Sequence, residues 1–422
     1  MKEAPEWEKE IGIEVYSSRC SPCRALARVH EGDFVVEETP SLEGLAEAPV
    51  PGYFPLYKVE KWSIDTMHLE RELSHALGCR VSLGGLKDKR AVAVQYATLI
   101  GRTPRRMEKV TGKNFRADLV GYVPAPITRA SVLSNRFRIT LRECCPSIET
   151  NAKEVFGLAS EGLVPNYFGH QRFGGSGART CGVGIALVKR DFEGAVRLML
   201  CEPRRNDDEA TVAARELMSS ERYAEGLALL PQSQDTERLV ARSMARDPTD
   251  HIRALRAVPL KLRRLFVQAY QSLIFNRSLS LAMREGIDIS SYAVGDNWCL
   301  VDGATMRFGL PHGVKEPAPD HAKPLVQIPG YAYRNYGSRF DPLTEEAMAV
   351  DGVRARDFFV SEMQEVSAEG GFRMPHVTLR DPSVEQRGEV SVLGLSLARG
   401  QYATIVLREV VKPSNPADIG VA

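Results

Sequence analysis

A single carboxylate in a cationic turn is the first candidate for chemistry. Asp88 follows Lys87 and precedes Lys89 and Arg90. Cationic neighbours favour the ionised form of a carboxylate, which suits a nucleophile or a general base. Strand-like segments lie on both sides of the turn, and loops between strands commonly present catalytic side chains from a rigid scaffold. Taken alone, however, an aspartate in a charged turn is more often only a turn residue.

Residues 165–174, with the sequence PNYFGHQRFG, form the second candidate. The segment combines aromatic rings, amides, an arginine and two glycines, which can stack bases, bond their edges and approach phosphate closely. Its candidate base-binding side chains are Asn166, Phe168, Gln171 and Arg172. The alternative is a structural loop whose aromatic residues fill the core, and composition alone favours that alternative slightly. The overlapping stretch 169–176 has P-loop spacing, but a glycine occupies the required lysine position, so nucleotide triphosphate hydrolysis is not expected.

The cysteines offer a weaker candidate. Cys20 and Cys23 form a C-x-x-C pair, but no second pair at zinc-site spacing follows, and the other cysteines are scattered. Residues 1–10 are charged and lack an apolar signal core, so we expect a cytoplasmic protein with reduced thiols and no metal site. A thiol oxidoreductase that uses Cys20 and Cys23 is the alternative, and loss of disulfide reduction in a Cys20→Ser variant would reveal it.

Basic side chains gather in one part of a nearly neutral chain. The protein has 55 Lys and Arg against 54 Asp and Glu, a formal net charge of +1. Residues 102–116 nevertheless contain six basic residues and one acid. Such segregation is typical of a nucleic-acid binder, although a solvated charged face is the simpler alternative. RNA fits better than duplex DNA because no recognition helix or zinc finger is evident. The predicted backbone contacts are Arg102, Arg105, Arg106, Lys109 and Lys113.

The elements that must position these residues follow an α+β pattern. The length of 422 residues indicates two or three domains, or one core with a large insertion. Alternation predicts strands at 81–85, 92–98, 136–142, 390–397 and 402–407, and helical spacing predicts a helix over 63–77 capped by Ser63 or Asp65. Helical patterns dominate from 192 to 285, and an irregular portion rich in Pro and Gly follows from 294 to 342. No apolar run is long enough to span a membrane.

Six segments together resemble one family, the TruD-type RNA pseudouridine synthases. Each is weak alone, but they occur in the family's order. The matching pieces are Arg28 with 33–37, Gly85-Leu86-Lys87-Asp88, Asn135-Arg136-Phe137, the block 165–174, Gln271–Asn276 and the tail 400–409, which looks like the family's final strand.

The resemblance implies a fold and a division of the chain. The fold is the pseudouridine synthase catalytic domain, built on a mixed, largely antiparallel sheet and formed by residues 1–165 with 374–422. A mostly helical α+β insertion domain, residues 166–373, interrupts it. This division agrees with the strand–helix–strand order found in the sequence itself.

The resemblance also implies an activity. Asp88 is expected to be the catalytic nucleophile, with Arg28, Lys87, Asn135 and Phe137 at the uridine pocket. The implied reaction is isomerisation of uridine to pseudouridine in tRNA, at uridine 13 of the D arm, without a cofactor, a metal or an obligatory protein partner. A non-catalytic RNA-binding protein or tRNA folding chaperone with the same fold is the alternative.

Overall fold

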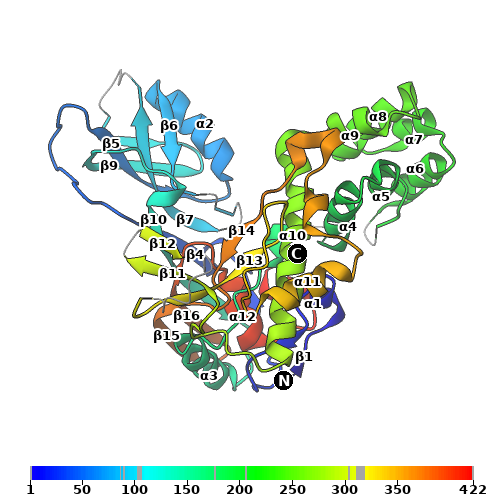
Figure 1. The fold of residues 1–422 in the computed structure, drawn as a ribbon. Helices are drawn as coiled ribbons and strands as arrows, with labels where there is room; N and C mark the ends of the chain where they lie inside the picture. Colours follow the sequence, from blue (N-terminus) through cyan, green and yellow to red (C-terminus); the bar gives the residue numbers. More distant parts are fainter. Residues whose placement is uncertain are drawn as a thin grey trace.

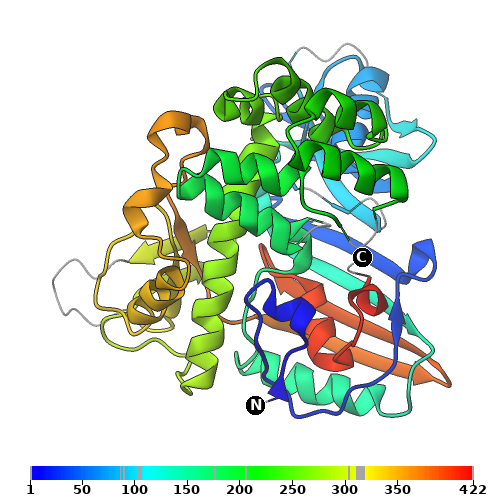
Figure 2. The same cartoon turned by 90° about the vertical axis from the view of Figure 1, so that its right-hand side faces the viewer.

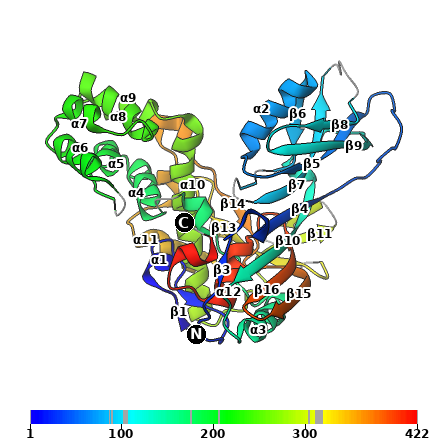
Figure 3. The same ribbon diagram turned by 180° about the vertical axis from the view of Figure 1, so that it is seen from behind.

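The computed structural model describes residues 2–85, 87–88, 91–101, 107–174, 177–204, 207–302, 305–309 and 319–420. Two arms rise from a shared base and lie on opposite sides of the molecule in Figures 1 and 3. We call them the sheet arm, which carries α2 (Thr66–Leu77) with strands β5, β6, β8 and β9, and the helical arm, which carries α4 to α9. Arg102, Arg105 and Arg106 lie outside the described residues.

A ten-stranded sheet forms the base and continues into the sheet arm. All of its pairs are antiparallel except β4 with β7. Strands from the two ends of the chain meet where β16 pairs with β10, which confirms the predicted mixed, largely antiparallel α+β fold. In order the strands are β15 (Leu379–Arg387), β16 (Val390–Ala398), β10 (Val132–Arg142), β4 (Phe34–Pro40), β7 (Val92–Ile100), β5 (Phe54–Lys61), β9 (Phe115–Val123) and β8 (Lys109–Thr111), with β3 (Leu26–Ala27) on β10 and β6 (Arg80–Leu83) on β7.

Alternation along β10 decides which of its side chains reach the core. Phe137, Ile139 and Leu141 are buried, while Arg136 and Arg138 between them are exposed. Phe137 lies opposite Leu395 of β16, so both strands send apolar side chains to the same layer. The predicted alternation holds from Arg136 to Ile139, but Thr140, which the pattern placed on the other face, is buried as well.

The predicted helix over 63–77 is also confirmed, with Asp65 as its cap. The Asp65 carboxylate accepts the backbone N–H groups of Met67 and His68, and the helix ends at Gly78 in the left-handed region, with φ 66°. Leu69 and Leu73 face a small apolar core within the sheet arm, which is separate from the main core. The catalytic candidate Asp88 follows soon afterwards on this arm.

The helical arm and a small second sheet occupy the middle of the chain. The helices predicted between 192 and 285 are present, and the 25-residue α10 packs against α4. Figure 2 shows α10, in light green, between the smaller sheet and α11 on one side and the chain ends on the other. The elements are α3 (Ile148–Ser160), α4 (Gly177–Val188), α5 (Phe192–Leu200), α6 (Glu209–Ser219), α7 (Tyr223–Leu229), α8 (Asp235–Arg246), α9 (His251–Arg256), α10 (Leu260–Arg284), β11 (Asn297–Asp302), β12 (Thr305–Gly309), β13 (Lys323–Ile328), α11 (Asp341–Ala349) and β14 (Gly371–Arg373).

The portion predicted to be irregular, 294–342, contains strands β11, β12 and β13, so that prediction was wrong in part. The proposed domain boundaries stay a prediction, since one apolar core runs from the sheet into the helices without a break. Within the described residues, no helix is long and apolar enough to cross a bilayer.

The C-terminal strand predicted at 402–407 is a helix, α12 (Ala403–Val411). Every residue of α12 is buried, and the run Thr404, Ile405 and Val406 near its start is β-branched, a composition that favours a strand in a sequence-based prediction. Two short N-terminal elements, α1 (Glu6–Lys9) and β2 (Val15–Tyr16), contribute residues that contact α12; β2 pairs with β1 (Lys2–Glu3).

The cysteine prediction needs a correction. Cys23 forms a disulfide with Cys145, whereas Cys20 is free and buried. The partners are 122 residues apart in sequence, so spacing within the C-x-x-C pair could not reveal the bond. Cys20 and Cys23 therefore do not pair with each other in the fold, as a redox pair would.

Candidate active site

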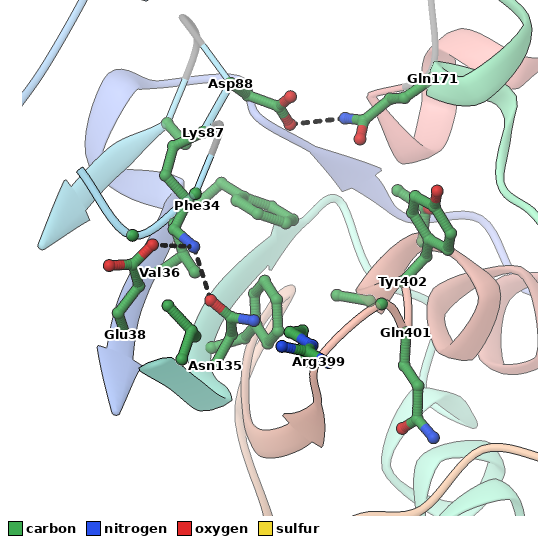
Figure 4. Close-up of a pocket in the computed structure, with 18 of the residues that line it drawn as sticks. Phe34, Val36, Glu38, Lys87, Asp88, Asn135, Gln171, Arg399, Gln401 and Tyr402 are labelled. Carbon is green, nitrogen blue, oxygen red and sulfur yellow. Dashed lines mark hydrogen bonds and ion pairs between the residues drawn. The ribbon is translucent and has the colours of Figure 1, made fainter. Parts of the chain in front are cut away.

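A cavity of about 210 Å³ opens between the sheet, the Asp88 turn and the start of α12. Figure 4 shows its walls. It brings together six of the residues predicted from sequence, which come from four separate segments of the chain. They are Arg28, Lys87, Asp88, Asn135, Phe137 and Gln171.

The backbone of the Asp88 turn is held by buried polar side chains. Lys61, at the end of β5, donates to the carbonyl oxygens of Asp88 at 2.7 Å and Ile64 at 2.8 Å. Thr66 accepts the Lys87 N–H at 2.8 Å, and Gln95 donates to the Gly85 carbonyl at 2.6 Å. Burial lowers the pKa of Lys61 to about 8, an effect that the Asp88 and Asp65 carboxylates partly oppose. The backbone of the turn is thus fixed by Lys61, Thr66 and Gln95, none of which is among the residues that line the cavity.

The Asp88 carboxylate accepts two hydrogen bonds through one oxygen. Arg28 Nη2 lies 2.9 Å and Gln171 Nε2 2.5 Å from Oδ2. No donor to Oδ1 is recorded among the described residues, and the side chain is 37% exposed. The two bonds orient the carboxylate, and its exposure leaves it accessible to a substrate in the cavity.

Arg28 is held in an unusual backbone conformation. Its φ of 61° lies in the left-handed region, which costs a non-glycine residue about 1–3 kcal/mol. Its guanidinium stacks over the Phe34 ring at 4.1 Å and its side chain is only 8% exposed. Such a constraint at a charged residue next to Asp88 favours a positioning role for Arg28.

The side chains of Lys87 and Asp88 point in different directions from the turn that carries them (Figure 4). Its Nζ lies 2.8 Å from Glu38 Oε1 and donates to Asn135 Oδ1 at 2.6 Å. Figure 4 shows this chain of Glu38, Lys87 and Asn135 along one wall. Phe137 forms the next part of the wall and meets the Phe34 ring edge-on, with centroids 5.9 Å apart. Polar and apolar surfaces therefore lie side by side, as a planar heterocycle requires.

The other residues predicted in the block 165–174 do not line the cavity. The carbonyl and side-chain oxygens of Asn166 accept from Arg373, whose guanidinium lies 4.2 Å from the Phe168 ring centroid. Burial lowers the pKa of Arg373 to about 10. Arg172 is half-buried and donates weakly to Ser272 of α10 at 3.4 Å. Gln171 is the member of the block that reaches Asp88, and its neighbours hold that loop against α10 and β14.

Lys109 and Lys113, predicted to contact an RNA backbone, are both exposed in the sheet arm. No carboxylate partner is recorded for either of them in the described chain. Their role stays a prediction.

Several cavity residues were not identified from the sequence. Glu38, Arg129, Arg399 and Tyr402 line it. A signal existed for Glu38, because Phe34, Val36 and Glu38 alternate on the buried face of β4. Arg399 and Tyr402 are brought in by the β16–α12 connection, which sequence alone assigned to the wrong kind of element.

Comparison with known proteins agrees with this arrangement over nearly the whole chain. A family model described as tRNA pseudouridine synthase D (TruD) matches residues 10–410. Proteins named as probable tRNA pseudouridine synthase D are 29% identical in Methanosarcina acetivorans, covering 97% of this chain and 98% of that protein, and 32% identical in Archaeoglobus fulgidus, covering 96% and 99%. A solved structure from Methanosarcina mazei, named as the putative tRNA pseudouridine synthase D (TruD), superposes with a TM-score of 0.78 at 28% identity, over 99% of this chain and 100% of the other. The chain therefore belongs to the tRNA pseudouridine synthase D family.

Proposed function

We propose that this protein is a tRNA pseudouridine synthase that isomerises uridine 13 in the D arm of tRNA, with Asp88 as its catalytic residue. The observation that carries the proposal is the Asp88 carboxylate, which lines the cavity and is oriented there by Arg28 and Gln171. Membership of the family supports the reaction, and the position of the target uridine in the tRNA is a further part of the proposal.

The reaction rearranges bonds without gain or loss of atoms. Asp88 either attacks C1′ or removes a ribose proton to start a glycal route, and the C1′–N1 bond breaks. The free uracil turns over, C5 bonds to C1′, the C5 proton leaves, and N1 takes up a proton. Phe137 and Phe34 would hold the base by their apolar rings while it is detached.

The uridine must leave its stack before it can reach Asp88, which costs a few kcal/mol. Arg129 and Arg399 at the cavity rim are suited to offset part of this cost by binding phosphate, since no carboxylate partner is recorded for either within the described residues. Lys109 and Lys113, with Arg102, Arg105 and Arg106 nearby in sequence, would extend contact to the tRNA backbone. Binding should weaken steeply with salt if they do.

The test compares the wild type with Asp88→Ala on tRNA transcripts that carry tritium at C5 of uridine. We expect tritium release by the wild type and none by the variant, with similar tRNA binding by both. Mapping the product then tests uridine 13. Release by neither protein, with tRNA still bound, would turn the conclusion toward a non-catalytic RNA-binding protein.

A further inference from the structure

The contacts that link Glu38, Lys87 and Asn135 bear on which bases the cavity accepts. This inference rests on the proposed function. We propose that Glu38 and Lys87 fix the Asn135 amide with its NH₂ group turned into the cavity. One donor then binds a uracil carbonyl both before and after the base turns over. Glu38 is in this sense a positioning residue, and Asn135 determines base specificity.

The orientation of the amide follows from the chemistry of its partner. An ammonium group only donates hydrogen bonds, so the Asn135 atom 2.6 Å from Lys87 Nζ must be the oxygen. Figure 4 shows the amide nitrogen on the side turned away from Lys87, in the direction of Arg399. Within the described residues, no intramolecular acceptor is recorded for this nitrogen. Asn135 therefore presents a free donor to the cavity that it lines.

Glu38 keeps Lys87 in this position. Glu38 lies directly opposite Asn135 in the antiparallel β4–β10 pair, so both side chains leave the same face of the sheet. The Glu38 side chain is 0% and the Lys87 side chain 10% exposed. A Cβ added at Gly84 would come within 2.9 Å of Glu38 Oε2, so the backbone closes tightly over the carboxylate. Moving the Lys87 ammonium away would leave the buried Glu38 carboxylate without a cation, so the ion pair holds Lys87 in place.

The symmetry of uracil explains why one donor suffices. Turning the base over about its N3–C6 axis exchanges N1 with C5 and also exchanges the 2- and 4-carbonyl groups. A donor placed at either carbonyl therefore meets a carbonyl again after the turn. Cytosine carries an amino group at C4, so one of its two orientations would set donor against donor and leave the Asn135 N–H unpaired.

Sulfur accepts hydrogen bonds poorly, so thiolated substrates test the donor directly. Single-turnover conversion is measured on tRNA with uridine, 2-thiouridine or 4-thiouridine at the target position. In the wild type we expect each sulfur to slow conversion by about tenfold, the effect of roughly one lost hydrogen bond. In Asn135→Ala both sulfur effects should fall below about twofold. An effect from only one sulfur, or equal effects in both proteins, would overturn this proposal alone.

The positioning role of Glu38 has a matched control in its neighbour. Glu37 leaves the opposite face of β4, is 41% exposed and pairs with Lys58 at 2.9 Å. Glu38→Gln should lower kcat with unchanged tRNA affinity and weaken both sulfur effects, whereas Glu37→Gln should change neither. If Glu38→Gln does not fold, as judged by circular dichroism, the Asn135→Ala series still decides. Absence of product from unsubstituted tRNA with the wild type would overturn the proposed function and this inference together.

Discussion

Two buried cations support the cavity from opposite sides, and they are stabilised in different ways. Arg408 of α12 forks onto the Glu8 carboxylate at 2.8 and 2.7 Å and donates to Glu409 at 2.6 Å. Among the described residues, Lys61 of β5 donates to two backbone carbonyls, those of Ile64 and Asp88. Burial alone would lower the pKa of both groups; the two carboxylates reverse this for Arg408, whose pKa is raised, whereas the pKa of Lys61 falls to about 8.

The difference gives the two cations different roles. Arg408 is a structural tether between two segments, and Lys61 is a support of the Asp88 turn that can lose its charge. Arg408 fastens α12, which begins at the cavity with Tyr402 and Thr404, to the N-terminal segment. Its partners are themselves charged and buried. Removing Arg408 takes the cation from both carboxylates, although Glu409 keeps its hydrogen bonds from the backbone N–H groups of Ser17 and Ser18. Removing Lys61 leaves neutral acceptors, so its loss disturbs the Asp88 turn more than the fold.

The largest effect is expected for Arg408→Met. Leaving the Glu8 carboxylate buried without its cation should lower the free energy of unfolding by about 3–5 kcal/mol. Urea unfolding followed by circular dichroism measures this. Arg387→Met is the matched control, because Arg387 is 87% exposed beside Glu385 and should lose less than about 0.5 kcal/mol. Similar losses in both variants would contradict the tether.

The pH dependence of stability separates the two cations next. Between about pH 8 and 10.5 the unfolded chain holds the Lys61 proton and the folded chain releases it, so Lys61 makes folded stability rise with pH. Relative to Lys61→Met, the wild type should gain up to about 3 kcal/mol from pH 7 to 10. Urea unfolding at four pH values checks the slope.

Lys58 on the same strand is the control for this slope. Its hydrogen bond to Glu37 raises its pKa, so its contribution is constant below pH 10. The difference between the wild type and Lys58→Met should therefore be flat over the same range. A flat difference for Lys61→Met as well would show that Lys61 is not buried as a cation.

The two supports also show how far sequence could be taken. The Asp88 turn, the Asp65 cap and the alternation of β10 follow from local patterns, and the structure has them. Arg408 is 400 residues from Glu8, so no spacing rule could pair them. The β-branched start of α12 favoured a strand, and tertiary burial overrides that preference in the fold. Glu38 was within reach of sequence analysis, because it continues the alternation of Phe34 and Val36 on the buried face of β4.

The smallest effect is expected from the neutral support of the same turn. Thr66→Val keeps the shape of the side chain but removes the oxygen that accepts the Lys87 N–H, leaving a buried donor unpaired. We expect a loss of about 1–2 kcal/mol in stability, and about a tenfold loss in kcat because the turn that aims Asp88 is loosened.

Thr98→Val separates these two effects. Thr98 is equally buried and accepts the Ile127 N–H at 3.0 Å, but it does not contact the Asp88 turn. Its substitution should therefore cost similar stability, measured by thermal unfolding, and leave kcat for tritium release unchanged. Equal loss of kcat in both variants would mean that activity follows overall stability, and that neither Thr66 nor Lys61 acts through the position of Asp88.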